Sequence, residues 1–580
     1  IFSGFPFLAD PQVGAWYPPN WPFFLIGITP RAIQFELLLH ALLACLGAFL
    51  FLQRYVANRA AAMVGALAYG LSGFFAEHSS HVGMFCTAAG LPWLLLCFDR
   101  ALESAPLRNT ILTGLVGGAM ILAGHFQVAL YSFAALGLVA IAKLIERPKT
   151  AARLLSILAG AAAISLLLSM IQTLPGLELA AQSIRSSANY ATTHERVLQP
   201  SALLNFFWPK ATGIFAGITD ASYYLYSGIL LIPLAVLGLK NKTLRIPGLL
   251  LTVLPLWYML GPDGGLYRLG AMIPGLHRVR APIHFLFVAV LGLAMLAAAG
   301  TAWILERWKT RWLVVVLPAL FFADVFYWNS LANPLAYARS SYDDLYGTRE
   351  RLAEEKVLPT QPPLTRFEMP ERLTVFGPLN HPLDLRLEAV YGYNPLELQS
   401  YAEYMAAAQM NRKLLNGLNV SRQLNAQLGA IEPNPNALPR AYFARKIIQV
   451  SAPTESLAML PSLDPAETAI LQGAIPSNEP DPGATVSSQG YRFHYRTSKP
   501  ALLKISIPYF PGWTASIAGR QYEILRVDHA LMGVVVPAGQ NGLVLHYRSN
   551  KFRLAATLSG ITLVLTLLVL AGTWRTRYSQ

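Results

Sequence analysis

The sequence predicts a mostly α-helical, polytopic membrane protein: a bundle of transmembrane helices, an extracytoplasmic region of mixed α/β and β-sandwich structure, and a final transmembrane helix. Of its 580 residues, 54% are hydrophobic and 13% are charged, and the mean hydropathy is +0.41. These values are too apolar for a soluble globular protein. Apolar runs close to the length of a helical span, about 17–25 residues, recur in the first part of the chain. A long polar stretch separates them from one last apolar run.

We interpret eleven apolar runs as membrane helices. Ten form the predicted bundle over residues 33–328, which has large outer loops at 174–223 and 261–281, and one lies in the C-terminal segment 554–580. The runs are residues 33–53, 60–76, 84–98, 108–123, 126–143, 154–173, 224–239, 247–260, 282–304, 312–327 and 554–574. An odd number of spans places the two chain ends on opposite sides of the membrane. Because the chain begins at Ile1 rather than Met, we expect a further helix ahead of the first loop, residues 1–32.

Basic residues fill every second gap between these runs. The positive-inside rule makes those gaps cytoplasmic, so the first loop and the region 329–553 are predicted to be extracytoplasmic. Short loops also account for much of the net charge of +14, so the expected partner is the lipid bilayer and not nucleic acid. The basic gaps contain Arg54 and Arg59; Arg100 and Arg108; Lys143, Arg147, Lys149 and Arg153; Lys240, Lys242 and Arg245; Arg307, Lys309 and Arg311; and Arg575 and Arg577.

The polar stretch divides by its residue pattern. Residues 329–489 have a mixed α/β pattern, whereas residues 490–553 alternate apolar and polar side chains, as from Leu503 to Ile507. Such alternation is typical of half-buried strands, and it predicts an extracytoplasmic β-sandwich ahead of the last helix. The three cysteines lie within apolar runs, so no disulfide framework is expected. They are Cys45, Cys86 and Cys97.

Asp10 is the sharpest catalytic candidate. It lies among apolar and aromatic residues of the first loop, close to Gln12 and Tyr17. A partly desolvated carboxylate has a raised proton affinity and suits a base that accepts a proton from a hydroxyl. The alternative is that Asp10-Pro11 starts a turn, and that Tyr17 belongs to an aromatic belt at the membrane interface.

Glu36 and His40 lie four residues apart, on one face of the first predicted helix. Ionisable groups inside a span are costly and usually face a polar cavity, so they are candidates to line a site beneath Asp10. The alternative is a structural pair whose polar groups satisfy each other.

Histidines mark two outer turns of the predicted bundle. His78 and His81 end the second helix, and His125 and Gln127 form the next outer turn. Two closely spaced histidines resemble half of a metal site, but a second spaced pair is missing. Substrate-facing or solvated histidines are the favoured interpretation.

Arginines on the outer side contradict the positive-inside pattern. Arg185, Arg278 and Arg280 lie in outer segments, and a guanidinium fork matches phosphate oxygens. They are candidate binders of a lipid phosphate, and snorkelling toward lipid headgroups is the alternative.

Several of these residues belong to short motifs that together resemble the YfhO family of bacterial membrane proteins. The motifs are Asp10-Pro-Gln with Tyr17-Pro18, Gly124-His-Phe-Gln127 with Tyr131, Gln182-Ser-Ile-Arg185, Arg278-Val-Arg-Ala-Pro282, Tyr509-Phe-Pro-Gly-Trp513, Ala518-Gly-Arg520, Val536-Pro-Ala-Gly539 and Tyr547-Arg-Ser-Asn-Lys-Phe552. Their order along nearly the whole chain carries the resemblance more than any single motif.

The resemblance implies a GT-C-like fold and activity in the bacterial plasma membrane. Enzymes of the GT-C class are glycosyltransferases that take a sugar from a polyprenyl-phosphate donor. An acidic residue of their first extracytoplasmic loop serves as base or metal ligand, a position that Asp10 occupies. The resemblance thus implies a hexosyltransferase that acts on a cell-envelope glycan or polymer, with a divalent cation as a possible cofactor.

Two other functions fit the sequence. A transporter or flippase of lipid-linked sugars is disfavoured because no inverted repeat is visible and the spans are largely apolar. A non-catalytic envelope assembly protein, whose β-sandwich binds partners, stays open because a fold does not determine a function.

Overall fold

The chain forms two compact units. The computed structural model describes residues 1–209, 224–273, 276–308, 310–332, 366–367, 380, 383, 387–425, 430–473 and 481–578. The membrane unit comprises Pro11–Leu174, Ala188–Arg339 and Leu554–Gln580, and the sheet unit comprises Ile1–Asp10, Pro175–Ser187 and Ser340–Arg553. The predicted first loop is therefore divided between the two units. Parts of the predicted outer loops 174–223 and 261–281 and of the region 329–489 lie outside the described residues.

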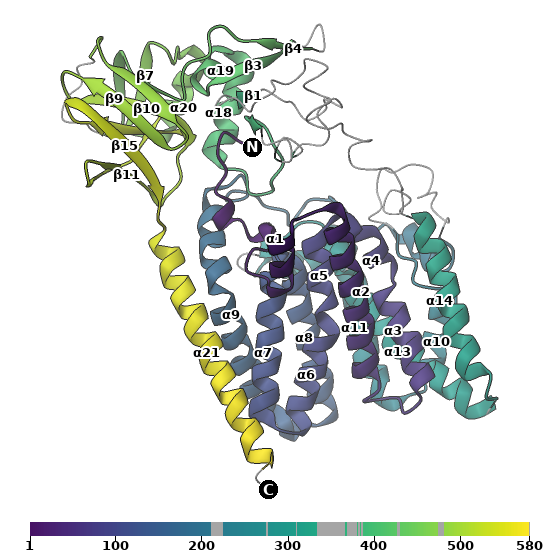
Figure 1. The fold of residues 1–580 in the computed structure, drawn as a ribbon. Helices are drawn as coiled ribbons and strands as arrows, with labels where there is room; N and C mark the ends of the chain where they lie inside the picture. Colours follow the sequence, from purple (N-terminus) through teal and green to yellow (C-terminus); the bar gives the residue numbers. More distant parts are fainter. Residues whose placement is uncertain are drawn as a thin grey trace. The chain divides into compact units, whose positions relative to one another are not determined.

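The membrane unit is a bundle of helices (Figure 1). Its helices are α1 (Trp21–Ile26), α2 (Pro30–Leu52), α3 (Arg59–Gly70), α4 (Gly73–Glu77), α5 (Val82–Ala89), α6 (Leu91–Glu103), α7 (Pro106–Leu122), α8 (Phe126–Glu146), α9 (Ala151–Gln182), α10 (Leu231–Gly238), α11 (Lys242–Met259), α12 (Leu266–Ala271), α13 (Leu286–Trp308), α14 (Leu313–Ala332) and α21 (Asn550–Tyr578). In the described residues, eight helical segments are long and apolar enough to cross a membrane. The prediction of a mostly α-helical, multi-pass membrane protein is confirmed.

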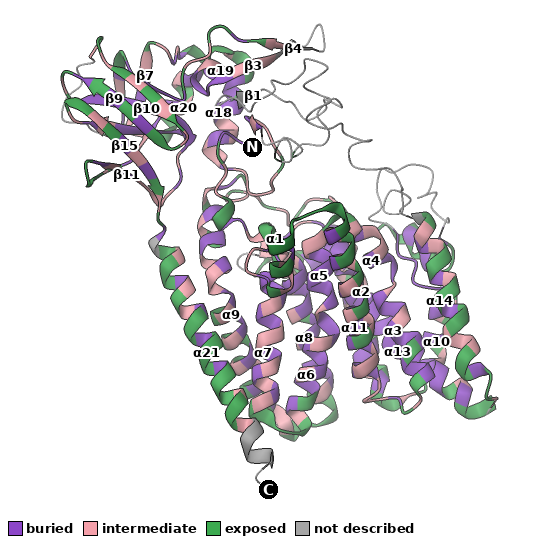
Figure 2. Cartoon of the chain, in the orientation of Figure 1, coloured by how far each residue is buried: buried purple, intermediate pink, exposed green. Residues whose placement is uncertain are grey.

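Helix α13 is the centre of this bundle. Its most apolar stretch is wholly buried, and Figure 2 shows it in purple, whereas α21 and α14 expose much of their surface. Small residues let backbones come close: a Cβ atom at Gly238 of α10 would lie 1.8 Å from the carbonyl oxygen of Leu296. A Cβ atom at Gly300 of α13 would lie 1.9 Å from that of Leu234. The glycines therefore fix where α10 and α13 cross.

Two predicted helices form without reaching the length and apolarity of a span, and a third is shorter than predicted. The runs 108–123 and 247–260 form α7 and α11, which are 17 and 18 residues long. The run 224–239 is helical only from Leu231, as α10. Its first residues are bonded to neighbouring elements instead: Tyr226 OH donates to Asp324 Oδ1 at 2.6 Å, and its carbonyl accepts from Gly73 N at 2.7 Å. Because Tyr226 is bonded to Asp324 and Gly73, residues 224–230 do not form the first turns of the predicted helix.

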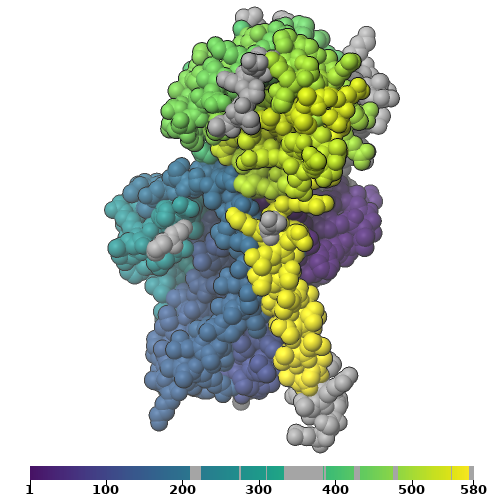
Figure 3. Space-filling model, turned by 90° about the vertical axis from the view of Figure 1, so that its left-hand side faces the viewer, coloured from purple at the N-terminus to yellow at the C-terminus, as the bar shows by residue number. Residues whose placement is uncertain are grey.

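The final helix α21 lies along α9 (Figure 3). Ser559 joins them, because its Oγ accepts from Ile171 N at 3.0 Å and donates to the Leu167 carbonyl at 3.0 Å. The predicted last membrane helix is confirmed.

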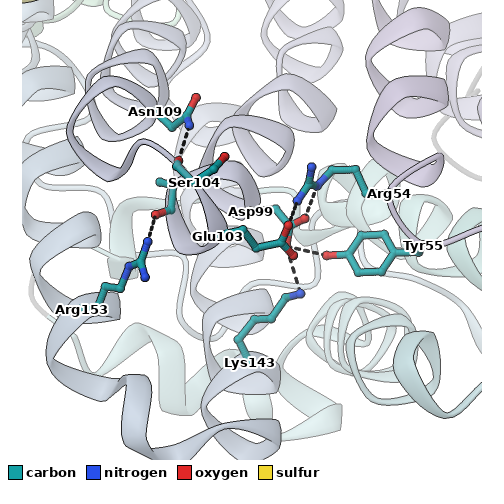
Figure 4. A network of polar contacts seen from close by, with 9 residues as sticks. Arg54, Tyr55, Asp99, Glu103, Ser104, Asn109, Lys143 and Arg153 are labelled. Carbon is teal, nitrogen blue, oxygen red and sulfur yellow. Dashed lines mark hydrogen bonds and ion pairs between the residues drawn. The ribbon is translucent and has the colours of Figure 1, made fainter. Parts of the chain in front are cut away.

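Three of the predicted basic gaps meet at one end of the bundle (Figure 4). The buried Asp99 carboxylate pairs with Arg54 and with Lys143, the latter at 3.0 Å, and it accepts from Tyr55 OH at 2.7 Å. Arg153 donates to the Ala101 carbonyl at 3.1 Å. The alternation of basic and non-basic gaps thus corresponds to the two ends of the bundle, while the cytoplasmic location of the basic end stays a prediction.

The sheet unit contains a four-stranded sheet, formed by its first four strands, and a β-sandwich backed by helices. Its strands are β1 (Arg366–Phe367), β2 (Glu388–Ala389), β3 (Val420–Asn425), β4 (Ala430–Pro433), β5 (Ala441–Phe443), β6 (Lys446–Val450), β7 (Thr468–Gln472), β8 (Thr485–Gln489), β9 (Arg492–Thr497), β10 (Ala501–Pro508), β11 (Trp513–Ile517), β12 (Arg520–Tyr522), β13 (Leu525–Val527), β14 (Leu531–Val536) and β15 (Gly539–Tyr547). A six-stranded sheet (β5-β10-β14-β13-β7-β6) and a five-stranded sheet (β12-β11-β15-β9-β8) share one apolar core. Helices α18 (Gln399–Met410), α19 (Lys413–Gly417) and α20 (Pro453–Met459) contribute to a second core with the six-stranded sheet.

The sandwich is larger than its sequence pattern indicates. Its first strand starts at Ala441, ahead of the expected boundary at Gly490. Strands β6 and β7 are parallel and connected by α20, so they lack the regular alternation of a half-buried hairpin. Strand β10 is buried along its whole length, because one of its faces meets each core.

A buried ion pair joins strands of the six-stranded sheet. Lys504 Nζ lies 2.5 Å from Asp528 Oδ2, and the two side chains are 1% and 0% exposed. Lys504 also donates to the carbonyls of Pro465 and Thr468, and Asp528 Oδ1 accepts from Ile470 N at 2.8 Å. The pair therefore fixes the positions of β10, β7 and the end of β13.

We predict that Lys504→Met destabilises the protein by about 3–5 kcal/mol, because it leaves a carboxylate buried without its cation. The double variant Lys504→Met/Asp528→Asn should be less destabilised, since no charge remains buried. The measurement is chemical unfolding of the full chain in detergent. The matched control is Lys413→Met, which breaks an exposed pair with Asp464 and should cost about 1 kcal/mol or less. Equal losses in Lys504→Met and in the control would contradict the prediction.

Candidate functional site

Asp10 and Arg185 meet the same loop of the sheet unit. Asp10 is 5% exposed, and its Oδ2 accepts from Asn394 Nδ2 at 2.6 Å. Arg185 Nε donates to the carbonyl of Pro395 at 2.9 Å. The loop is shaped locally, because Asn394 Oδ1 accepts from Leu396 N at 2.8 Å in a turn that asparagine favours. The structure thus brings a predicted base and a predicted phosphate binder to two successive residues.

The chain around Arg185 is held to the same loop by backbone pairing. Ile184 N donates to the Glu397 carbonyl at 2.9 Å, and Ser183 forms an isolated antiparallel bridge with Leu398. Sequence reasoning missed Asn394. The available signal was the Asn394-Pro395 pair, which marks a turn but does not reveal its distant partner.

A second group lies inside the membrane unit and contains Glu36, His40 and Tyr17. Tyr17 OH and His40 Nε2 lie 2.8 Å apart, and Cys86 Sγ donates to Glu36 Oε1 at 3.5 Å. Burial, followed by the charges of Cys86 and Glu36, raises the pKa of Tyr17 well above its usual range. Tyr17 is therefore a neutral hydroxyl donor. Cys86 was predicted to be a small buried hydrophobe, and its contact with Glu36 was missed.

Two cavities flank this group. One has a volume of about 160 Å³ and is lined by Gln12 and Glu36, among others. The other has a volume of about 330 Å³ and is lined by Tyr17, His40 and Cys86, among others. Glu36 lines the smaller cavity and His40 the larger one, and a common site beneath Asp10 stays a prediction. Gln12 and Glu36 both line the smaller cavity.

A third group consists of four histidines. His284 is central: its ring centroid lies 5.4 Å from that of His78 and 6.2 Å from that of His125. The His78 and His81 centroids are 5.9 Å apart. His78 Nδ1 donates to the Phe74 carbonyl at 2.8 Å, whereas His284 Nδ1 is buried without a hydrogen-bond partner among the described residues. His284 was missed, because it follows Pro282 in an otherwise apolar run.

Two arginines, Arg196 and Arg280, act on the histidine group through their charges. The charge of Arg196 contributes, after burial, to the lowered pKa of His81. Burial lowers the pKa of His125 to about 4, with further contributions from His81 and Arg280. Arg280 Nη1 lies 3.2 Å from Glu195 Oε1. His81 and His125 are therefore kept neutral near two guanidinium groups, a setting that favours an anionic ligand.

Gln127 fixes the backbone beside Arg280. Its Nε2 donates to the carbonyls of Arg280 and Ala281, at 2.5 and 3.1 Å, and to Tyr131 OH at 3.0 Å. Ala281 has a left-handed backbone with φ of 53°, which is costly for a residue with a side chain. The predicted outer turn at 125–127 and the segment 278–282 are thus neighbours, and Gln127 acts on them through backbone contacts. Arg278 is exposed.

The predicted site residues other than the exposed Arg278 form three groups. The first is in the sheet unit and the other two are in the membrane unit. The groups are Asp10 with Arg185; Gln12, Tyr17, Glu36 and His40; and His78, His81, His125, Gln127 and Arg280.

Comparison with known proteins confirms the predicted resemblance. The family described as Bacterial membrane protein YfhO matches residues 430–559. A relative described as Uncharacterized protein YfhO, from Bacillus subtilis (strain 168), is 33% identical over 73 residues, which make up 13% of this chain and 8% of that protein.

Solved structures of arabinofuranosyltransferase AftD from Mycobacteria are similar over most of this chain. For one, the TM-score is 0.46 at 13% identity, with 93% of this chain and 53% of the AftD chain covered. For a mutant form, the TM-score is 0.43 at 11% identity, with 93% and 56% covered. This chain spans about half the length of these AftD chains.

The lowered pKa of His125 predicts a pH dependence of stability. Between its ordinary value of 6.5 and about 4, the unfolded chain binds a proton that the folded chain excludes. Stability should thus fall as the pH drops through this range, by at most about 1.4 kcal/mol per pH unit for this one group. His125→Asn should have a shallower slope, because asparagine can still cap α8 but does not titrate. The measurement is chemical unfolding as a function of pH.

His194→Asn, at an exposed histidine, is the matched control for His125→Asn. Its slope should equal that of the unmodified protein. A His125→Asn slope as steep as that of the control would contradict a buried neutral imidazole.

Proposed function

We propose that the protein is a membrane glycosyltransferase that moves a sugar from a polyprenyl-phosphate donor to a cell-envelope acceptor on the extracytoplasmic side of the bacterial plasma membrane. The observation that carries the proposal is the group of Arg196, Arg280 and four histidines at the end of the bundle opposite to the Asp99 network. The match to Bacterial membrane protein YfhO supports the membrane setting.

The ligand that suits this group is a phosphate. Its guanidinium groups carry fixed positive charge and planar donors, which match phosphate oxygens. The lowered pKa of His81 and of His125 keeps these imidazoles neutral, so they are free to donate one N–H each without repelling the arginines. A phosphate that leaves from the anomeric carbon gains negative charge, and preorganised donors stabilise such charge in the transition state.

The base in this proposal is Asp10. Its carboxylate is buried, and Asn394 orients one of its oxygens. It would accept the proton of the acceptor hydroxyl while that oxygen attacks the anomeric carbon and the C–O bond to the phosphate breaks. The sugar is transferred with inversion, and the proton stays on the carboxyl group until solvent removes it.

We predict that Asp10→Asn lowers the transfer rate by roughly 10²–10⁴, the contribution of a positioned general base. The readout is mass spectrometry of envelope glycopolymers in a strain that lacks the native gene and carries either the unmodified or the variant chain. Asp263→Asn, at a mostly exposed acid, is the control and should restore full modification. Full modification with Asp10→Asn at equal protein level would overturn this role.

We predict that Arg280→Gln weakens the binding of polyprenyl phosphate by roughly tenfold or more, as expected for loss of a charged hydrogen bond. Binding is measured by native mass spectrometry of the full chain in nanodiscs. Arg100→Gln, at the opposite end of the bundle, is the matched control, because it removes the same charge far from the histidines. Equal affinities of the two variants would exclude Arg280 from phosphate binding.

A further inference from the structure

Three chemically different metal-ligating groups converge between α2 and α5. The Glu36 carboxylate, the His40 imidazole and the Cys86 thiol each offer an atom, and these atoms all lie within 4.8 Å of one another. The residues are 6%, 1% and 3% exposed. Glu36 and His40 are one helical turn apart on α2, which places both on the face that meets α5.

The hydrogen bonds of His40 fix which ring nitrogen faces this group. Nδ1 lies 2.8 Å from the Glu36 backbone carbonyl, which can only accept, so Nδ1 carries the proton. Nε2 therefore has the lone pair, and it accepts from Tyr17 OH at 2.8 Å. Histidines that bind metal usually donate their other N–H to a carboxylate, a backbone carbonyl or water, and the Glu36 carbonyl takes this role here.

A negative charge on the buried Glu36 carboxylate would also need a nearby cation to be stable. Among the described residues, the partner of this carboxylate is the Cys86 thiol, at 3.5 Å, which is a weak donor. Elsewhere in the bundle the buried Asp99 has Arg54 and Lys143. A carboxylate inside a span without a cation is costly, so it is either protonated or neutralised by an ion.

We propose that Glu36, His40 and Cys86 bind a divalent transition-metal ion of the zinc type. Thiolate and imidazole select such ions, whereas magnesium and calcium prefer oxygen ligands. Binding converts the Cys86 thiol to a thiolate and releases its proton to solvent. The hydrogen bond from Tyr17 OH to His40 Nε2 then breaks, and the Nε2 lone pair binds the metal.

The fourth position of this site faces open space. The cavity of about 330 Å³ is lined by His40, Cys86 and Tyr17, so a water molecule or a ligand oxygen can complete a tetrahedral site. Three protein ligands with one exchangeable position are typical of zinc sites that act on a bound ligand, whereas structural sites have four protein ligands.

The test uses cobalt(II) as the probe and the purified full chain in detergent, stripped of metal. The unmodified chain should bind one Co²⁺ and show a thiolate-to-cobalt charge-transfer band. Cys86→Ser should abolish the band, and Glu36→Gln should weaken Co²⁺ binding at least tenfold. Cys97→Ser, at a cysteine of α6 outside this group, is the matched control and should keep both band and affinity.

A measurement of thermal stability provides a second test, which also distinguishes loss of metal binding from poor folding of a variant. Zn²⁺ should raise the thermal unfolding midpoint of the unmodified chain and of Cys97→Ser, but not that of the isosteric Glu36→Gln. No Co²⁺ binding by the unmodified chain, or a charge-transfer band that survives in Cys86→Ser, would overturn the proposal and leave a protonated Glu36 in a neutral hydrogen-bonded cluster. None of these readouts involves sugar transfer, so their outcome is independent of the proposed enzymatic function.

Discussion

The cost of placing charge in an apolar bundle determines where the polar side chains of this protein lie. Asp99 is buried together with two cations and a tyrosine at one end of the bundle. Asp324 is used as a cap, because its oxygens accept from Tyr226 OH and Ile229 N. Glu36 is the contrasting case, since its described partner is a thiol. Asp99 has cations that offset the cost of burying its charge, so no ligand is needed to explain it. Glu36 has no such cation among the described residues, so a bound ion is the simplest explanation for its burial.

Close packing of α13 places the histidine group on a rigid support. The helix is enclosed by neighbours that touch its backbone at glycine positions, and His284 lies in the short 3₁₀ segment Pro282–Phe285 that leads into it. Gln127 and the carbonyls of Arg280 and Ala281 fix the chain just before that segment. A site that must hold a charged group needs donors that do not rearrange when the ligand arrives. The bundle supplies that rigidity through backbone contacts.

The sequence predicts the fold class well and the contacts of the site poorly, for physical reasons. Apolar runs predict spans because the bilayer sets both their length and their composition, and alternation predicts β10 and β11. Helix 224–239 is wrong in its first half, because Tyr226 and Asp324 bond across about a hundred residues and local propensity does not include such bonds. Cys86, His284 and Asn394 were missed for the same reason: each gains its role from a partner distant in sequence.

Asp10 is the last residue of a segment that belongs to the sheet unit, while the residues that follow it belong to the membrane unit. Gln12 and Tyr17 belong to the membrane unit, whereas Asp10 belongs to the sheet unit and accepts a hydrogen bond from Asn394 of that unit. The segment before Asp10 is also bonded to the sheet unit, because the hydroxyls of Ser3 and Tyr401 lie 2.8 Å apart. A turn initiator would need only its local backbone. The long-range amide contact to Asp10 instead orients the carboxylate itself, and this hydrogen bond offsets part of the cost of burying the group. Asp10 also ends the turn Phe7–Ala9, where its N–H donates to the Phe7 carbonyl, so the local turn and the long-range contact coexist. If Asp10 is the base of the proposed transfer, Asn394 is its positioning residue.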